Sequence, residues 1–200
     1  MTRESVDVDA LQIPEIIDRT APSADTPFLP FQVFVDQSVP DFLPIGCNVP
    51  VRQTSSTHGE NGYITTDHSE IARILQRLKT KLESAVDSFS FYESHTVRGS
   101  ETLIIAYGVT ARAAKSVYKE LKSAGKPVRL LILKTLWPVP ESLLREKAAA
   151  YSRIVVVEMN LGQYVREIQR VLPDHDIRFL GQMNGELIKP HQIQEVVNGE

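Results

Sequence analysis

The sequence predicts a three-layer α/β/α fold with a mostly parallel sheet, preceded by an extended arm and a long helix. The prediction depends on three apolar runs, at 102–108 (TLIIAYG), 129–134 (RLLILK) and 153–160 (RIVVVEMN). Each run is followed by a segment whose apolar residues recur at helical spacing. Because the runs are nearly continuous rather than alternating, we expect strands that are buried on both faces, as in a parallel sheet covered by helices.

Composition limits the class of protein. A chain of 200 residues with 42% hydrophobic content can bury one core, and its net charge of −3, with no sustained Lys/Arg block, argues against a nucleic acid or a membrane surface as the main partner. The single cysteine, Cys47, rules out an internal disulfide framework and is typical of a reducing compartment. No long apolar run and no signal peptide are found, so we expect a soluble cytoplasmic protein.

Residues 1–66 predict an extended, proline-rich arm. Seven of the 12 prolines lie between Pro14 and Pro50, and each restrains its own backbone and that of the preceding residue. Disorder is the alternative, but the arm contains aromatic and aliphatic side chains that are costly to leave in water. These are Phe28, Phe31, Phe34, Phe42, Leu43 and Ile45. We therefore expect the arm to pack over a surface, either of this chain or of a partner.

Residues 67–99 predict a long helix and a short edge strand. Asp67 followed by Glu70 forms a capping-box pattern at the start of the helix. The apolar face then repeats at helical spacing through Ile71, Ile74, Leu75, Leu78 and Leu82. Residues 88–96 alternate between apolar and polar types, as an edge strand does. The expected organisation is therefore an arm at 1–66, a helix and edge strand at 67–99, and an α/β domain at 100–200.

Local signals place the helices of the α/β domain. Thr110 is positioned to cap the first helix, and Gly125 to end it. The Trp137-Pro138 segment bends the chain before a helix that ends near residue 150. A helix over 164–171, a short strand over 177–180 and a final helix that starts at Pro190 complete the domain.

No sequence motif identifies a catalytic, cofactor-binding or metal-binding residue. The turn after the first strand, 108–112, lacks the glycines of a dinucleotide loop and the Gly-Lys-Ser/Thr of a phosphate loop. The five histidines show no metal-ligand spacing, and Cys47 has no histidine or cationic neighbourhood that would activate its thiol.

The chain resembles a known enzyme family in several segments. The segments GVTARAAKSV, LLILKTLWPVPESLLRE and IVVVEMNLGQ resemble, in order and spacing, the C-terminal domain of the alpha subunit of 2-oxoacid:ferredoxin oxidoreductases of the 2-oxoglutarate and branched-chain types. The turn that contains Thr57, His58, Glu60, Gly62 and Tyr63 also resembles that subunit, although Gly59 stands where the family usually has an acidic residue. More distantly, the α/β domain is similar to the C-terminal domain of transketolase.

The resemblance implies a non-catalytic assembly domain within a larger complex. That complex would oxidatively decarboxylate a 2-oxoacid to an acyl-coenzyme A and pass electrons to ferredoxin, using thiamine diphosphate, magnesium and iron–sulfur clusters held outside this chain. Its partners would be a thiamine-binding beta subunit and the rest of the alpha subunit, and the domain would form a homo-oligomer. Two alternatives remain open: a free-standing α/β module that binds a nucleotide or coenzyme A, and a structural scaffold.

Candidate interface residues are expected mainly at the carboxyl edge of the sheet, where the turns after parallel strands converge. They are Thr110, Arg112, Trp137, Glu158, Asn160 and Gln163, together with His58 from the upstream turn. Arg112 lies in the first turn of a helix, where a cation is unfavourable, so we expect Glu158, a partner's carboxylate or a phosphate to offset its charge. The alternative is an Arg112 side chain that extends into water.

Overall fold

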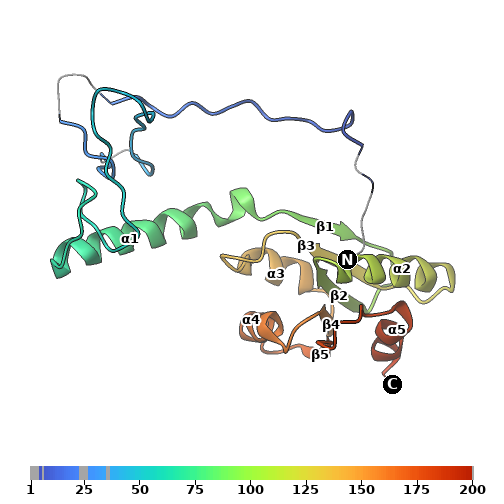
Figure 1. The fold of residues 1–200 in the computed structure, drawn as a ribbon. Helices are drawn as coiled ribbons and strands as arrows, with labels where there is room; N and C mark the ends of the chain where they lie inside the picture. The colour runs from blue at the N-terminus through green and yellow to red at the C-terminus, as the bar shows by residue number, and fades with distance from the viewer. Residues whose placement is uncertain (1–4, 6, 23–26, 35–36, 200) are drawn as a thin grey trace. The chain divides into compact units, whose positions relative to one another are not determined.

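A computed structural model describes residues 5, 7–22, 27–34 and 37–199 (Figure 1). It divides the chain into two units, Met1–Ser84 and Ala85–Glu200. The second unit contains the sheet. Within the described residues, no helix combines the length and the apolar character needed to cross a bilayer.

The sheet has five strands in the order β1-β3-β2-β4-β5. Their bounds are Tyr92–His95 (β1), Thr102–Tyr107 (β2), Arg129–Leu133 (β3), Arg153–Glu158 (β4) and Asp176–Gly181 (β5). The strands β3, β2, β4 and β5 pair in parallel, and β1 pairs antiparallel with β3 at one edge. The predicted mostly parallel sheet is confirmed. The edge strand predicted within 88–96 is also confirmed, as β1.

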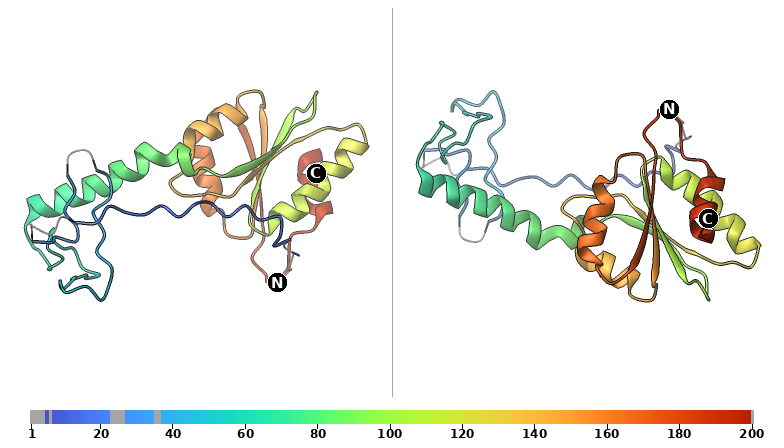
Figure 2. Two further views of the ribbon diagram at one scale, coloured as in Figure 1. Left: turned by 90° about the horizontal axis from the view of Figure 1, so that it is seen from above. Right: turned by 90° about the horizontal axis from the view of Figure 1, so that it is seen from below.

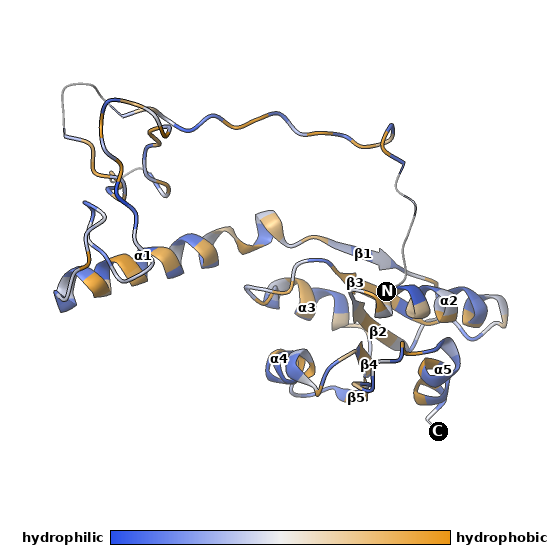
Figure 3. Cartoon of the chain, viewed as in Figure 1, coloured by the Kyte–Doolittle hydropathy of each residue, from blue (hydrophilic) through white to orange (hydrophobic). Residues whose placement is uncertain are grey.

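Helices cover both faces of the sheet (Figure 2). Helices α3 (Glu141–Ala148) and α4 (Gln163–Val171) pack on one face, against a buried cluster that includes Leu103, Ile105 and Val156. Helices α2 (Thr110–Ser123) and α5 (Pro190–Asn198) pack on the other, against Ile104, Ala106 and Val157. Alternate residues of one strand therefore enter different cores, which explains the continuous apolar runs (Figure 3).

The first unit consists of the arm and of the helix α1 (His68–Ala85) up to Ser84. The described residues before α1 form turns and a single isolated bridge between His58 and Ile64, and no helix or named strand. Asp67 caps α1 as predicted, because its Oδ1 accepts hydrogen bonds from the backbone N–H groups of Ser69 and Glu70 at 2.8 and 2.9 Å. A short 3₁₀ helix, Val86–Phe89, precedes β1 in the second unit.

One predicted cap is wrong. Thr110 is the first residue of α2, and Val109 holds the N-cap position without a side-chain hydrogen bond to the helix. The Thr110 hydroxyl instead donates towards the carbonyl oxygens of Tyr107 and Val157, at 2.7 and 3.1 Å. Tyr107 is the last residue of β2 and Val157 the last but one of β4, so the hydroxyl serves the carbonyls of two adjacent strands instead of the helix. Gly125, with φ of +70°, does lie just beyond the end of α2 as predicted.

Candidate functional site at the carboxyl edge of the sheet

The structure brings most of the predicted site residues to one edge of the second unit. Thr110 and Arg112 follow β2, Trp137 follows β3, and Glu158 ends β4. Asn160 and Gln163 come directly after Glu158, in the turn that leads into α4. His58 belongs to the first unit and is described separately below.

Glu158 is the centre of a buried polar cluster. Its side chain is completely buried, and its Oε2 accepts hydrogen bonds from the Tyr107 hydroxyl at 2.5 Å and from the Asn160 amide nitrogen at 2.9 Å. The same amide nitrogen also donates to the Tyr107 hydroxyl oxygen at 2.7 Å. A buried carboxylate needs such donors, because burial without them would cost several kcal/mol.

The remaining donors to Glu158 come from the first turn of α4. The backbone N–H of Val165 donates to Oε1 at 2.9 Å, and that of Tyr164 donates to Oε2 at 3.2 Å. The two preceding N–H groups, of Gly162 and Gln163, donate to Oδ1 of Asn160 at 2.8 and 3.1 Å. The first N–H groups of this helix, which have no partner within the helix, thus donate to side chains of the same chain.

This arrangement places a negative charge at the positive end of a helix dipole. In other α/β proteins a phosphate or another anionic ligand takes such a position. Here the carboxylate of Glu158 takes it, and the cluster can therefore stabilise the fold without any ligand. The predicted pairing of Arg112 with Glu158 or with a partner's carboxylate stays a prediction.

Two tyrosines beside Glu158 are held in their neutral form. Burial, followed by the hydrogen bond to the Glu158 carboxylate, raises the pKa of Tyr107 above its ordinary value. Burial also raises the pKa of Tyr164, with smaller contributions from Glu167 and Glu158. The two rings meet edge to face with centroids 5.5 Å apart. Neither phenol is therefore suited to act as a base near neutral pH.

Trp137 differs from the buried cluster because 73% of its surface is exposed. It lies in the loop between β3 and α3, and the Trp137–Pro138 peptide bond is cis. An indole in water forgoes the burial that large aromatic side chains usually provide. Trp137 is therefore a better candidate for a contact surface than for a site of chemistry.

A second charged cluster lies at the same edge, beside β1. Glu93 forms ion pairs of 2.8 Å with both Lys115 of α2 and Lys134, which follows β3. Hydrogen bonds from these two ammonium groups lower the pKa of Glu93 to about 2. His95 lies 3.5 Å from the same carboxylate. The cluster ties the antiparallel strand to the rest of the unit.

In the first unit, His58 is packed into a tight turn. Its ring stacks near Phe31, with centroids 3.8 Å apart, and its Nδ1 lies 3.0 Å from the carbonyl oxygen of Gly59. A Cβ atom at Gly59 would come within 2.7 Å of the Glu70 carboxylate. Helix α1 thus brings a carboxylate to this turn, beside the glycine that departs from the family pattern. The contacts assign His58 to the packing of the turn.

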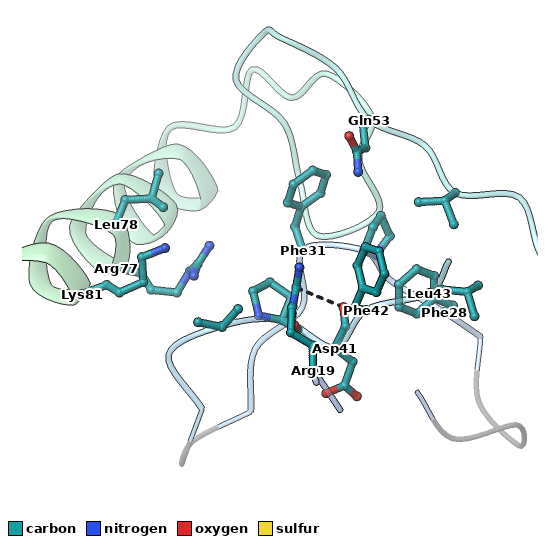
Figure 4. A pocket seen from close by; sticks show the side chains of 14 residues that line it. Arg19, Phe28, Phe31, Asp41, Phe42, Leu43, Gln53, Arg77, Leu78 and Lys81 are labelled. Carbon is teal, nitrogen blue, oxygen red and sulfur yellow. Dashed lines mark hydrogen bonds between the residues drawn. The ribbon is translucent and has the colours of Figure 1, made fainter. Parts of the chain in front are cut away.

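A cavity of about 300 Å³ also lies within the first unit (Figure 4). Three cations, Arg19, Arg77 and Lys81, line it together with the rings of Phe31 and Phe42. The Arg19 guanidinium lies 5.0 Å from the Phe42 ring centroid and donates to the carbonyl of Pro40, and Arg77 donates to the carbonyl of Ser38. The two arginines therefore tie segments of the arm together and to α1.

The potential metal-ligating side chains do not fit the magnesium and iron–sulfur cofactors that the family resemblance implies. Across the described parts of the chain, no group of three or more His, Cys, Asp and Glu side chains is placed to hold a metal ion. The single thiol, Cys47, is exposed, whereas an iron–sulfur cluster commonly takes four cysteine ligands. Neither the magnesium of a thiamine site nor an iron–sulfur cluster can be assigned to these residues.

The sequence reasoning identified Glu158 but missed Tyr107 and the Glu93 cluster. The sequence did contain a signal for Tyr107, because this residue ends the apolar run before Gly108 and is therefore expected at the same carboxyl edge as Glu158. Ala106 pairs with Val157, so the next residues, Tyr107 and Glu158, lie side by side. Glu93 offered no such signal, because its partners come from α2 and from the loop after β3.

In comparisons with known proteins, the chain matches a family model and several oxidoreductase subunits. Residues 100–193 match the family described as pyruvate:ferredoxin oxidoreductase core domain II. The chain is 30% identical over 172 residues to the 2-oxoglutarate synthase subunit KorA of Methanothermobacter thermautotrophicus, covering 85% of this chain and 46% of that protein. It is 36% identical over 149 residues to KorA of Archaeoglobus fulgidus, covering 74% of this chain and 41% of the relative. The chain thus spans less than half the length of these two relatives.

Two further matches broaden the comparison. The chain is 29% identical over 134 residues to the ketoisovalerate oxidoreductase subunit VorB of M. thermautotrophicus, covering 67% of this chain and 38% of that one. Among solved structures, the 2-oxoglutarate:ferredoxin oxidoreductase of Magnetococcus marinus, with 2-oxoglutarate, coenzyme A and succinyl-CoA bound, matches with a TM-score of 0.75. That match has 21% identity and covers 92% of this chain and 32% of the other, so it supports the fold alone.

Proposed function

We infer that this chain, which belongs to the family of 2-oxoacid:ferredoxin oxidoreductase subunits, supplies its complex with an assembly domain and leaves the chemistry to other parts. The complex would oxidatively decarboxylate a 2-oxoacid, transfer the acyl group to coenzyme A and pass the electrons to ferredoxin. Relatives named 2-oxoglutarate synthase favour 2-oxoglutarate as the substrate, and those named ketoisovalerate oxidoreductase favour a branched-chain 2-oxoacid.

One observation carries this proposal: the similarity to KorA covers 85% of the chain, while the side chains that the structure describes do not fit the metal cofactors of such an enzyme. Thiamine diphosphate, magnesium and the iron–sulfur clusters would then be held by partner polypeptides. Those partners are a thiamine-binding beta subunit and a polypeptide equivalent to the rest of the KorA-type subunit. A cytoplasmic location agrees with the single exposed cysteine.

A free-standing module for a nucleotide or coenzyme A is the weaker candidate. In open α/β folds such a ligand binds at the carboxyl edge of the sheet, where a helix N-terminus holds its phosphates. At α4 the corresponding N–H groups donate to Glu158 and Asn160. A phosphate would have to displace a buried carboxylate to reach them.

Purification of the tagged chain from the organism that encodes it tests the proposal. The expected result is a complex that reduces a viologen dye only when a 2-oxoacid and coenzyme A are both supplied. The separately produced chain should lack this activity and show no heat of binding on titration with thiamine diphosphate and magnesium. Saturable binding of that cofactor to the chain alone, or a purified complex without 2-oxoacid-dependent activity, would contradict the proposal.

A further inference from the structure

The cavity of the first unit brings three positive charges together (Figure 4). Arg19 lines it from the arm, and Arg77 and Lys81 line it from successive turns of α1. Asp41 is the one carboxylate among the described lining residues, and its Oδ1 accepts a hydrogen bond from the side-chain amide of Gln37 at 3.3 Å. The described lining residues therefore carry a net charge of +2.

Two other cations of α1 show that ion pairs are available to this helix. Arg73 forms an ion pair of 2.9 Å with Glu60, and Lys79 lies 3.9 Å from Glu83. Within the described residues, the three cations of the cavity have no such carboxylate partner. The two that α1 contributes are also four residues apart, a spacing at which like charges on a helix repel each other. A bound anion would offset this repulsion.

The two arginines of the cavity are oriented by the backbone of the arm. Nη2 of Arg19 donates to the carbonyl oxygen of Pro40, and Nη1 of Arg77 donates to that of Ser38 at 3.3 Å. The Arg19 guanidinium also lies 5.0 Å from the centroid of the Phe42 ring. An arginine has five N–H donors, so each guanidinium is held in place and still has N–H groups to offer a ligand.

These donors suit carboxylates better than phosphates. A planar carboxylate can accept two parallel N–H bonds from one guanidinium. Phosphate sites usually add backbone N–H groups from a helix N-terminus or a glycine-rich turn. Arg77 and Lys81 come instead from the middle and the second half of α1. In the arm, Pro30 and Pro40 belong to the lining, and proline has no backbone N–H.

The size of the cavity and its apolar lining restrict the ligand further. Its volume of about 300 Å³ is at the lower end of the range for small-molecule pockets, which suits a small metabolite better than a coenzyme. Phe31, Phe42 and Leu78 border the charged groups. Apolar side chains lower the local dielectric constant and strengthen the attraction between opposite charges. A net charge of +2 matches an anion with two or three carboxylates.

We propose that this cavity binds a small polycarboxylate, an organic anion with two or three carboxylate groups, between Arg19 of the arm and Arg77 and Lys81 of α1. The bound anion fastens the arm to the helix, because it contacts both at once. The inference goes beyond the proposed function, since it assigns a ligand to the first unit and no step of the reaction depends on it.

Calorimetric titration of the chain at constant ionic strength tests the proposal. Citrate should bind at one saturable site with a Kd between about 10 micromolar and 1 millimolar, and acetate at least about 10-fold more weakly. Lys81→Gln should weaken citrate binding by about 10-fold, because it removes a charge-assisted hydrogen bond. Lys81→Arg keeps the charge and should retain the affinity. Lys79→Gln, on the same helix but outside the lining, is the matched control and should bind citrate as the wild type does.

The order of the arm gives a second measurement. The backbone N–H of Phe42 donates to the carbonyl oxygen of Thr20 at 2.9 Å, next to Arg19 in the sequence. With citrate at about 10 times its Kd, hydrogen exchange of this amide should slow by about 10-fold, because the anion binds the ordered arm. The amide of Val156, in a strand of the other unit, should exchange at the same rate with and without citrate.

Three outcomes overturn the proposal. Absence of saturable citrate binding would show that water alone solvates the three cations. Equal affinities of the wild type and Lys81→Gln would place the bound anion elsewhere. Tighter binding of sodium pyrophosphate than of citrate, without magnesium, would assign the cavity to phosphates. Circular dichroism of each variant separates lost binding from lost folding. None of these results bears on the 2-oxoacid-dependent activity of the complex, so the proposed function fails or survives separately.

Discussion

Tyr107 donates a 2.5 Å hydrogen bond to the carboxylate of Glu158, joining the last residues of two adjacent parallel strands. The bond has a neutral donor and an acceptor that carries a buried charge, a combination stronger than an ordinary hydrogen bond. Asn160 donates to both partners, so the three side chains form one connected network. Removing one of these side chains should therefore change how much the other two contribute to the stability of the fold.

Tyr107→Phe should destabilise the protein by about 1–2 kcal/mol, because the buried carboxylate loses one donor. Glu158→Gln should cost about 3 kcal/mol, since its amide turns a donor towards the N–H groups of α4. In urea denaturation the double variant should lose less unfolding free energy than the two single variants lose together. The difference, which measures the coupling, should be about 1 kcal/mol. Ser116→Ala, which removes an exposed hydrogen bond to Glu120, is the control and should be nearly neutral. Strictly additive losses would contradict the network.

The raised pKa of Tyr107 predicts a loss of stability at alkaline pH. A phenol whose pKa is higher in the folded than in the unfolded chain contributes stability that is complete below its ordinary value of about 10, and this contribution disappears as the pH rises beyond it. The difference in phenolate absorbance between wild type and Tyr107→Phe reports the ionisation of Tyr107. It should appear only above the pH range in which free tyrosine ionises. If Tyr107 ionised at the same pH as free tyrosine while the protein was still folded, the prediction would be wrong.

The ion pairs of Glu93 predict a loss of stability in acid. Because its pKa falls from 4.5 to about 2 on folding, the stabilisation is present above pH 4.5 and disappears between there and pH 2. The side chain is one-third exposed, so solvent screening limits the effect to about 1 kcal/mol. Stability measured across this range should fall less steeply for Glu93→Gln than for wild type. The surface variant Glu146→Gln should follow the wild-type curve, and identical slopes for all three proteins would exclude the assignment.

Two glycines of the first unit should respond very differently to alanine. Gly62 has φ of +77°, and a Cβ atom there would lie 2.3 Å from the carbonyl oxygen of Arg52, which is backbone and cannot rotate away. Gly46 has φ of +101° with open space around it. Gly62→Ala should therefore cost at least about 3 kcal/mol and Gly46→Ala about 1–2 kcal/mol. Hydrogen exchange at the turn amides of Gly59 and Gly62 should accelerate in the first variant only; equal rates would refute the clash.

The sheet was predictable from the sequence because strands buried on both faces require continuous apolar runs. A run such as Val155, Val156 and Val157 supplies both cores in alternation, as a strand covered by helices on both faces does. Glycine and proline signals were also reliable at Gly125 and Pro190, where the backbone conformation itself selects the residue. Thr110 failed as a cap because two strand carbonyls compete for its hydroxyl, and that competition arises only in the folded sheet.

The site was less predictable because it depends on contacts between elements. Glu158 was identified as a candidate from its position at the end of a strand, but its role as the acceptor for the α4 amides follows from the path of the turn at Gly162, with φ of +86°. The arm shows a similar limit. Its aromatic residues were expected to pack, and Phe28 and Phe31 are half-buried, whereas Phe34 and Phe42 are largely exposed.

The carboxylate at the start of α4 also affects what this fold can evolve into. Where a helix end binds a free anion, one mutation that adds a donor can improve affinity while folding is unaffected. In this chain the acceptor is covalently attached, so a lineage could open the same amides to a new metabolite only by replacing Glu158, and the first step would weaken folding before any affinity appeared. Selection for stability thus protects this corner of the domain against the acquisition of new chemistry.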